Sequence, residues 1–381
     1  MVIYFDNAAT SFPKPEVVYD AVDYYYRYIG TSSGRGAYRQ ALQADEMVLE
    51  TRNLLGQLFN IKDVNNIVFT ANITESLNLA LKGLLQTGDH VITSQMEHNA
   101  MWRPLKVLEK EKGIEITVIP CPEGRAFDPR EIENNIRSNT RLVALNHASN
   151  VTGTIMPIKE AGEICNRYQL PLLVDTAQTA GVYPLDLEDC NINLLAFTGH
   201  KGLLGPTGTG GLYIEPGLSL KPLKDGGTGG DSMLEHQPED LPERFEAGTL
   251  NLAGIAGLGA SVKFLLGKGI GEIRAREKEL TSFLLELLNK LPGITVYGPQ
   301  NAEDRVAVLS FNLENVLPGE AAYILDEVYG IMVRSGLHCA PQAHRCSGTE
   351  EQGTVRVGLG YFNTPAEVKQ FFKAVKEIVQ N

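Results

Sequence analysis

Residues 194–211 read Leu-Leu-Ala-Phe-Thr-Gly-His-Lys-Gly-Leu-Leu-Gly-Pro-Thr-Gly-Thr-Gly-Gly, and the interpretation of the whole chain depends on this stretch. Its apolar start predicts a strand that delivers Lys201 into a glycine-rich turn, and the apolar residues 212–214 predict the strand that leaves it. A lysine held between strand ends is desolvated. Its ammonium is then disfavoured, its pKa falls, and the free amine can form a Schiff base with a carbonyl compound. The alternative is a lysine in a surface loop, because most charged side chains are exposed.

Short apolar segments alternate with helical segments on both sides of this stretch. Such alternation is typical of a mostly parallel sheet with helices on both faces. Strands are expected at 67–70, 90–93, 114–119, 142–145, 172–174, 194–197 and 211–214, and helices at 16–28, 42–59, 74–84, 101–112, 128–136 and 158–168. We therefore expect an α/β fold whose large domain is a mostly parallel seven-stranded sheet sandwiched by helices.

The glycine-rich segment 226–230 interrupts the alternation. After it come a helix-rich stretch and then a mixture of strands and helices, which predicts a smaller α+β domain. Helices are expected at 270–288, 319–328 and 365–379, and strands at 306–311, 331–334 and 354–358. We assign residues 16–257 to the large domain and residues 1–15 and 258–381 to the small one, with the long helix 270–288 bridging them.

The composition narrows the class of protein. Hydrophobic residues make up 43% of the 381 residues, and the net charge is −12. An acidic globular chain is a poor partner for nucleic acid or an anionic membrane, so neither is expected. No signal peptide or membrane-spanning segment is expected, because no long apolar run is present. The five cysteines are sparse and odd in number, which favours the reducing cytoplasm over a disulfide framework.

A carboxylate follows the strand expected at 172–174. In open α/β sheets, ligands bind outside the carboxyl ends of the strands, so Asp175 lies where a ligand would bind. A helix N-cap is the alternative role for this aspartate. Lys201 follows another strand end of the same sheet, and a lysine with a carboxylate is the pair that pyridoxal phosphate requires. The lysine would form the Schiff base, and the carboxylate would keep the pyridine nitrogen protonated.

Other polar residues follow strand ends of the same sheet. Residues 70–76 join a strand to a helix start, where free N–H groups and hydroxyls can bind a phosphate, although a helix cap involving Thr74 or Ser76 would use the same residues. Thr198 and His200 can complete a phosphate site beside the lysine. Two further candidates are His98, which can stack on a cofactor ring, and Asn150, which can bond the substrate or the cofactor.

Two other interpretations of the glycines are excluded. A Walker phosphate loop needs Ser or Thr after its lysine, but Gly202 follows Lys201. A dinucleotide-binding fingerprint needs G-x-G-x-x-G between the first strand and helix of a βαβ unit, and the sequence has none there.

The segment 333–346 combines two histidines, two arginines and two cysteines. We expect no metal, because structural zinc sites use paired ligand spacings and ligands crowded on one loop rarely close a tetrahedron. We instead interpret Cys339 as a nucleophile. Positive neighbours favour the reactive thiolate, and the charged or polar candidates are Arg334, His338, His344 and Arg345. The alternative is an inert cysteine, but the polar composition of the segment does not resemble a core.

Along nearly its whole length, the chain resembles the class V aminotransferase family of fold type I pyridoxal phosphate enzymes. Within that family it resembles the cysteine desulfurase and selenocysteine lyase group. The motifs that carry the resemblance are Tyr4-Phe5-Asp6-Asn7-Ala8-Ala9-Thr10, Thr74-Glu75, Glu97-His98-Asn99, Ser149-Asn150-Val151, Asp175-Thr176-Ala177-Gln178, Thr198-Gly199-His200-Lys201, Phe245-Glu246-Ala247-Gly248-Thr249, Arg334-Ser335-Gly336-Leu337-His338-Cys339-Ala340 and Arg356. Each motif is modest, but the ordered set is specific.

The resemblance implies a site built around pyridoxal phosphate. Lys201 would be the Schiff-base lysine, Asp175 the partner of the pyridine nitrogen, and His98 the residue that stacks on the ring and serves in catalysis. The remaining cofactor-binding residues implied are Asn150 and Gln178, with Thr74, Thr198 and His200 at the phosphate and Thr249 from the second subunit of a homodimer. Arg356, with Asn150, would bind the substrate, since a guanidinium matches a carboxylate in two hydrogen bonds.

The resemblance also implies that Cys339 takes sulfur from L-cysteine as a persulfide, leaving L-alanine. The loop is similar to the short loop of group II desulfurases, but Leu337 replaces a usual histidine, Pro341-Gln342 replaces Gln-Pro, and His344 and Cys346 are additions. A sulfur-acceptor protein and a place in sulfur metabolism, such as iron–sulfur cluster assembly, are further implications. A selenocysteine lyase, or an aminotransferase or epimerase of the same family, is the alternative function.

Overall fold

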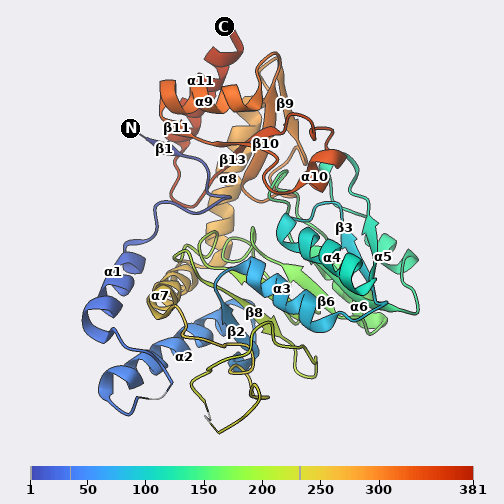
Figure 1. The fold of residues 1–381 in the computed structure, drawn as a ribbon. Helices are drawn as coiled ribbons and strands as arrows, with labels where there is room; N and C mark the ends of the chain where they lie inside the picture. The colour runs from blue at the N-terminus through green and yellow to red at the C-terminus, as the bar shows by residue number, and fades with distance from the viewer. Residues whose placement is uncertain (1, 35, 231–232, 381) are drawn as a thin grey trace.

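The computed structural model describes residues 2–34, 36–230 and 233–380. Figure 1 shows a lower body built around a large sheet and an upper body that contains both described ends of the chain. Helix α8 (Ile270–Leu288) runs between the two bodies. The N-terminal segment begins in the upper body and descends to α1 (Glu16–Tyr24) in the lower one.

The large sheet confirms the predicted architecture. Its seven strands follow the order β2-β8-β7-β6-β5-β3-β4, and β8 alone runs antiparallel to its neighbours. The strands are β2 (Ile67–Thr70), β3 (His90–Ser94), β4 (Glu115–Ile119), β5 (Thr140–Asn146), β6 (Leu172–Asp175), β7 (Leu194–Thr198) and β8 (Gly210–Ile214). The ends of β5, β6 and β7 lie side by side, because Asn146 pairs with Asp175 and Asp175 with Ala196.

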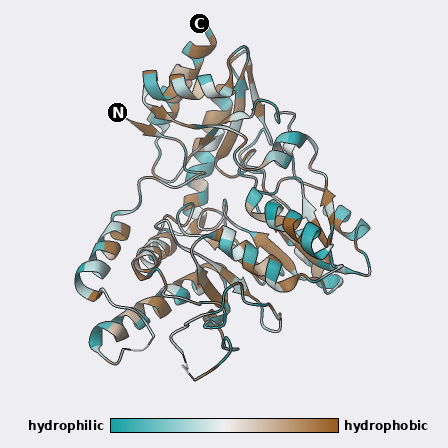
Figure 2. Ribbon diagram, in the orientation of Figure 1, coloured by the Kyte–Doolittle hydropathy of each residue, from teal (hydrophilic) through white to brown (hydrophobic). Residues whose placement is uncertain are grey.

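Helices cover both faces of this sheet, because successive strand residues point to opposite sides. Leu194 and Ala196 of β7 join the core beneath α3 (Ile73–Leu84) and α4 (Asn99–Lys112), whereas Leu195 and Phe197 join the core on the other face. That second core is closed by helices α2 (Arg39–Phe59), α5 (Arg130–Asn134), α6 (Ile158–Arg167) and α7 (Leu252–Lys268). In Figure 2 the strands are accordingly brown, and the helices show alternating brown and teal faces.

The upper body is an α+β unit. Its antiparallel sheet has the order β12-β13-β10-β9, and the short strands β1 and β11 pair in parallel beside it. The elements are β1 (Ile3–Tyr4), β9 (Ile294–Tyr297), β10 (Val308–Leu313), α9 (Pro318–Tyr329), β11 (Ile331–Met332), β12 (Arg334–Gly336), α10 (Pro341–Cys346), β13 (Thr354–Gly358) and α11 (Pro365–Gln380). Short turns of helix complete the fold at Tyr25–Ile29, Val64–Asn66 and Pro122–Gly124.

Strands β9 and β12 have no counterpart in the sequence-based prediction. β9 is a partly exposed strand at the edge of its sheet, and β12 is only three residues long, so neither has a strong apolar pattern. The helix expected at 128–136 is shorter than predicted. It lies between Pro129 and Asn135, which have the two cap positions.

The hydrophobic cores bear on the proposed domain division. The pairing of β1 with β11 supports grouping the N-terminal residues with the small domain. Helix α7, however, packs in the large-domain core through Leu258, Val262 and Leu265. Along α8 the packing passes from that core at Ile273 to the small-domain core at Leu280. We therefore propose that the boundary lies inside α8 rather than at residue 257.

Within the described ranges, no single helix is both long and apolar enough to cross a membrane. Helices α7 and α8 pass the length and composition test only as a pair, which is bent by 81°.

Two helical glycines provide a matched test of packing. A Cβ on Gly162 of α6 would lie 1.9 Å from the backbone oxygen of Cys190, whereas a Cβ on Gly267 of α7 would meet no atom within 4 Å. We expect Gly162→Ala to lower the free energy of unfolding by about 2 kcal/mol or more through overpacking. Gly267→Ala should raise it by about 0.5 kcal/mol through helix propensity. Urea unfolding measures both, and equal effects would contradict this description of the α6 contact.

Candidate active site

The candidate site lies at the carboxyl ends of β5, β6 and β7. Lys201 follows β7 by three residues and is half-buried. Burial lowers its pKa to about 8, Asp175 opposes that shift, and Arg356 and Arg334 add to it. The structure thus brings Lys201 and Asp175 from two neighbouring strands into one electrostatic environment. An amine with this pKa is partly uncharged near neutral pH, as a nucleophilic lysine requires.

Asp175 ends β6 and is 4% exposed. Its Oδ1 accepts a 2.8 Å hydrogen bond from the backbone N–H of Ala177. Burial raises the pKa of this carboxyl, while the Ala177 bond and Lys201 lower it. A buried carboxyl whose ionisation depends on a nearby cation is suited to pair with a protonated ring nitrogen.

His98 caps a helix and also lies in the candidate site. Its Nδ1 accepts a 3.0 Å hydrogen bond from the N–H of Ala100 and caps α4, so the proton of the neutral ring lies on Nε2. Burial, and then the charges of Lys201 and Arg356, lower its pKa to about 4. The ring is therefore neutral and belongs to the same site as the lysine.

The expected phosphate-binding region differs in one detail from the prediction. Asn72, not Thr74 or Ser76, caps α3, and its side chain accepts from the N–H of Glu75. The Ser76 hydroxyl instead donates to the carbonyl of Gly211. Thr74 is exposed in the first turn of α3, where unpaired backbone N–H groups point outward. A helix start with a free hydroxyl remains suited to an anion.

Thr198 and His200, which lie beside Lys201 in the sequence, also fit a phosphate group. The Nδ1 of His200 is buried and has no hydrogen-bond partner among the described residues. Thr198 is buried at the end of β7, and its hydroxyl makes a long, 3.4 Å contact with the carbonyl of Thr209. A buried ring nitrogen without a partner is uncommon in proteins, and a phosphate oxygen at this point would satisfy it. The donors present therefore fit the phosphate of pyridoxal phosphate.

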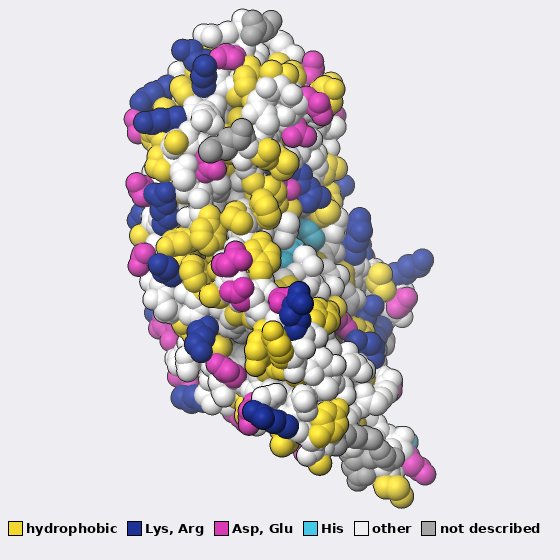
Figure 3. All heavy atoms as spheres, turned by 90° about the vertical axis from the view of Figure 1, so that its left-hand side faces the viewer, with side chains coloured by type: hydrophobic (Ala, Val, Ile, Leu, Met, Phe, Trp, Pro, Cys, Tyr) yellow, Lys and Arg dark blue, Asp and Glu magenta, His cyan; other side chains and the backbone are white. Residues whose placement is uncertain are grey.

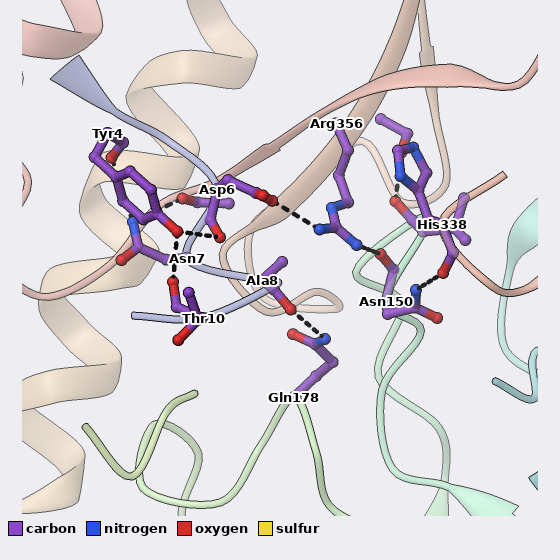
Figure 4. A network of polar contacts seen from close by, with 12 residues as sticks. Tyr4, Asp6, Asn7, Ala8, Thr10, Asn150, Gln178, His338 and Arg356 are labelled. Atoms are coloured by element: carbon purple, nitrogen blue, oxygen red, sulfur yellow. Dashed lines mark hydrogen bonds and ion pairs between the residues drawn. The ribbon is translucent and has the colours of Figure 1, made fainter. Parts of the chain in front are cut away.

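Arg356 of β13 connects three segments that are far apart in the sequence, as Figure 4 shows. Its Nη2 donates to Asp6 Oδ1 at 2.8 Å, and its Nη1 donates to the carbonyl of Asn150 at 3.1 Å. Asn150 in turn donates from Nδ2 to the carbonyl of His338 at 2.7 Å. The guanidinium is 2% exposed, and its Nε has no partner among the described residues. Asp6 was not identified as a site residue from the sequence.

Two other predicted cofactor ligands have different surroundings. Gln178 donates from Nε2 to the carbonyl of Ala8 at 3.0 Å, so one of its two amide hydrogens is already used (Figure 4). Thr249 is exposed and lines a cavity with Glu75 and Lys224 that does not include Lys201. Within one chain, the structure therefore does not bring Thr249 to the lysine.

Cys339 is exposed on the loop between β12 and α10. Its carbonyl accepts a 2.8 Å hydrogen bond from the N–H of Asn99, so the loop is attached to the start of α4, next to His98. His338 and Cys339 have φ values of 48° and 58°, two successive left-handed residues without glycine. Each such residue costs about 1–2 kcal/mol, so the surrounding contacts must hold the loop in this conformation.

The histidines of this loop are not the cations expected from the sequence. His338 is buried against Thr354, and His344 is buried with its Nδ1 2.7 Å from the Thr349 hydroxyl. Burial lowers the pKa of both, to about 4 for His344, so both rings are neutral. Their ring centroids are 5.6 Å apart. Arg356 is a cation whose charge interacts with Cys339.

Glu97 is a site residue whose importance the sequence did not reveal. It is completely buried, and its Oε1 accepts from the Ser94 hydroxyl at 2.7 Å and from the N–H of Asn146 at 3.0 Å. Its Oε2 has no partner among the described residues. Burial, helped by the charge of Asp175, raises its pKa to about 8 despite these two hydrogen bonds. The side chain is thus a neutral acid at pH 7. Among the described residues, no group of three or more His, Cys, Asp or Glu side chains is arranged to hold a metal ion.

Comparisons with known proteins show the family to which the chain belongs. The family model for class V aminotransferases matches residues 3–371. A probable cysteine desulfurase from Methanothermobacter thermautotrophicus is 38% identical over 99% of this chain and 94% of its own length. A cysteine desulfurase from Escherichia coli is 33% identical over 98% of this chain and 93% of its own.

Solved structures agree as well. An apo cysteine desulfurase from Thermococcus onnurineus superimposes with a TM-score of 0.94 at 35% identity, over 100% of this chain and 95% of that one. The S-sulfonic acid form of the cysteine desulfurase CsdA from Escherichia coli gives a TM-score of 0.90 at 29% identity, with the same coverage. The chain belongs to the class V aminotransferase family, whose members depend on pyridoxal phosphate.

Glu97 gives a prediction for stability. Its pKa is about 8 in the folded protein and near 4.3 when unfolded, so the folded state binds the extra proton between these values. Stability therefore falls as the pH rises from about 4.3 to 8. Glutamine does not titrate. Glu97→Gln should match the wild type near pH 4.5 and exceed its unfolding free energy by about 4 kcal/mol at pH 8.

Urea unfolding at a series of pH values tests this prediction. The exposed Glu327 of α9 supplies the control, since Glu327→Gln should leave the pH dependence unchanged. A Glu97→Gln variant with the wild-type pH dependence would show that Glu97 is ionised in the folded protein.

Proposed function

We propose that the chain is a pyridoxal phosphate-dependent cysteine desulfurase. It would convert L-cysteine to L-alanine and transfer the sulfur to Cys339 as a persulfide. The observation that carries this proposal is the hydrogen bond between the carbonyl of Cys339 and the N–H of Asn99, which attaches the cysteine loop beside His98 in the site of Lys201. The names of the relatives and of the similar solved structures support a desulfurase over an aminotransferase or epimerase.

The chain's own residues would hold the cofactor. When bound, pyridoxal phosphate supplies an electron sink that allows the Cα–H bond of an amino acid to break. Lys201 would anchor it and Asp175 would pair with its ring nitrogen, while the neutral face of His98 would stack on the ring. The remaining ligands proposed are Gln178 and Asn150 at the ring oxygen and Thr74, Thr198, His200 and the partner subunit's Thr249 at the phosphate.

Lys201 would also move a proton. With a pKa lowered to about 8, the side chain exists in both protonation states near neutral pH. It can therefore accept the Cα proton as a free amine and release it again as an ammonium. Burial is the main cause of this pKa, so exclusion of water from the site helps to set the base strength of the lysine.

Arg356 would orient the substrate carboxylate. Two of its N–H groups already bond to Asp6 and Asn150, whereas its buried Nε has no partner. Asp6 balances the buried guanidinium, and the carboxylate of an incoming amino acid can take up the unused donor. The side chain of Asn150 has an unpartnered Oδ1 that can accept from the substrate amine.

Sulfur transfer would then occur on Cys339. Its thiolate attacks the sulfur of the substrate, an S–S bond forms as the C–S bond breaks, and the electron pair of the broken bond is protonated at carbon. The overall change is L-cysteine plus the Cys339 thiol to L-alanine plus the Cys339 persulfide. No external oxidant or reductant is required. A sulfur-acceptor protein would later remove the persulfide sulfur at the exposed loop.

Exposed aromatic residues support a homodimer. Figure 3 shows hydrophobic side chains gathered on the face where α1 and α2 lie. Large exposed hydrophobic residues on α1, on the helical turn Tyr25–Ile29 that follows it, and on α2 with its N-cap are Val17, Tyr19, Tyr24, Tyr26, Tyr28, Tyr38, Leu42 and Leu49. Contiguous apolar surface of this kind marks interaction sites. We propose that a second copy covers this face and brings its Thr249 to the cofactor, and that the enzyme acts in the cytoplasm.

Replacing the nucleophile tests the proposed function. Cys339→Ser should reduce alanine formation from cysteine by about 100-fold or more, because serine cannot accept sulfur. Wild-type enzyme incubated with cysteine should gain one sulfur on the peptide that contains Cys339, as measured by mass spectrometry. Cys346→Ser, on the same segment, is the control and should keep both properties. Full activity in Cys339→Ser would refute the proposal.

The dimer can be tested separately. A Tyr26→Glu, Tyr28→Glu double variant should weaken self-association by about 1,000-fold, since buried tyrosines contribute about 2 kcal/mol or more each at such interfaces. Light scattering over a range of concentrations measures the change. Tyr323→Glu, on the exposed face of α9, is the control and should remain dimeric. Unchanged association in the double variant would place the interface elsewhere.

A further inference from the structure

A small cavity lies behind Lys201, on the side of helix α8. Its volume is about 40 Å³, and Lys201, Gln178, Asn7 and Ser11 line it together with Glu277 of α8. Glu277 therefore comes from the helix that joins the two bodies, whereas Lys201 comes from the large sheet. Glu277 and Lys201 therefore line one cavity, although they come from different parts of the molecule.

The Glu277 carboxyl has no hydrogen-bond or ion-pair partner among the described residues. It is 5% exposed, yet no described residue makes a hydrogen bond or an ion pair to its side chain. Glu277 lines the same cavity as Lys201. Arg274, one turn earlier on α8, interacts with it only through charge, since this guanidinium donates instead to the carbonyls of Ala302 and Glu303.

Buried carboxyls in proteins almost always have hydrogen-bond partners. A cavity needs about 10–15 Å³ to hold one water molecule, so 40 Å³ has room for about three. The polar groups around it, namely the carboxyl, the amine and the amides of Asn7 and Gln178, supply the partners that such water needs. Water in this position would join Glu277 to Lys201 by hydrogen bonds.

We propose that Glu277 exchanges a proton with Lys201 through water in this cavity. Glu277 would thus be a positioning residue, which acts through Lys201 and does not touch the substrate. The step is balanced: the O–H bond of the neutral carboxyl breaks, a proton passes along the water, and the free amine becomes an ammonium beside a carboxylate. The reverse step restores both neutral groups. This inference rests on the proposed role of Lys201 as the residue that moves the substrate proton.

The protonation states support this exchange. Burial raises the pKa of Glu277 to about 8, opposed by Arg274, and burial lowers the pKa of Lys201 to about 8. Similar proton affinities make transfer in either direction inexpensive. Among the charged groups of neighbouring elements, Arg274 on α8 acts on Glu277. Those that act on Lys201 are Asp175 after β6, Asp6 in the N-terminal segment, Arg334 on β12 and Arg356 on β13.

The experiment measures the titration of Lys201 without using desulfurase activity. The full chain, freed of cofactor, is treated with an amine-acylating reagent at graded pH, and peptide mass spectrometry gives the fraction of Lys201 labelled. In the wild type, ionisation of Glu277 favours the lysine ammonium. Glu277→Gln removes that anion. The midpoint, which is the pH at which half of Lys201 is labelled, should therefore fall by about 0.5–1 pH unit. A merely structural glutamate would leave the midpoint unchanged.

Glu279→Gln is the matched control, since Glu279 is exposed on the same helix and pairs with Arg276. Its midpoint should equal that of the wild type. Glu277→Asp, which moves the carboxyl back by one methylene, replaces Glu277→Gln if that variant does not fold. It should lower the midpoint of Lys201 labelling by a smaller amount. An unchanged midpoint in a folded Glu277 variant, or an equal shift in Glu279→Gln, would overturn the proposal. Persulfide formation on Cys339 is measured independently, so failure of either hypothesis is distinguishable.

Discussion

The arrangement of the site depends on one buried guanidinium. Arg356 is almost completely enclosed, and a buried charge without partners is costly, so its contacts with Asp6 and Asn150 must form together. These contacts fix the N-terminal segment against the small-domain sheet and the large-domain loop against both. Since Asn150 also holds the carbonyl of His338, the loop that carries Cys339 is fixed by the same arrangement. One side chain thereby connects the region proposed to bind the substrate to the proposed nucleophile, Cys339.

Burial also determines which groups of the site can move protons. It brings the pKa values of Lys201, Glu97 and Glu277 to about 8 from opposite directions, and it keeps the ring of His98 neutral. The carboxyls become neutral and the lysine amine becomes a weaker base, because the carboxylate and the ammonium both lose hydration on burial. The site therefore has acids and a base of matched strength, and the ring of His98 is not charged. This arrangement suits a reaction in which a proton leaves one carbon and another is later protonated.

Much of the fold could be predicted because its signals are local. The buried strands are continuous apolar runs, so the seven strands and the helices that cover them were found with small errors at their ends. The strands β9 and β12 were missed because an exposed edge strand and a three-residue strand have little apolar pattern. The alternative role considered for Thr74 or Ser76, capping α3, belongs to Asn72, because all three residues are capable caps and only the backbone decides among them.

The sequence by itself determined the family and led to the predictions for Lys201 and Cys339, since ordered motifs and strand ends can be read along the chain. The tertiary structure decided the charges and the partners, because these depend on residues hundreds of positions apart. His338 and His344 are neutral only because the fold buries them, and Asp6 meets Arg356 only because β1 and β13 belong to one small domain. Glu277 reaches the space behind Lys201 for the same reason: α8 crosses from one core to the other. The desolvation of these side chains and their long-range contacts arise from tertiary packing, which no single segment of the sequence determines.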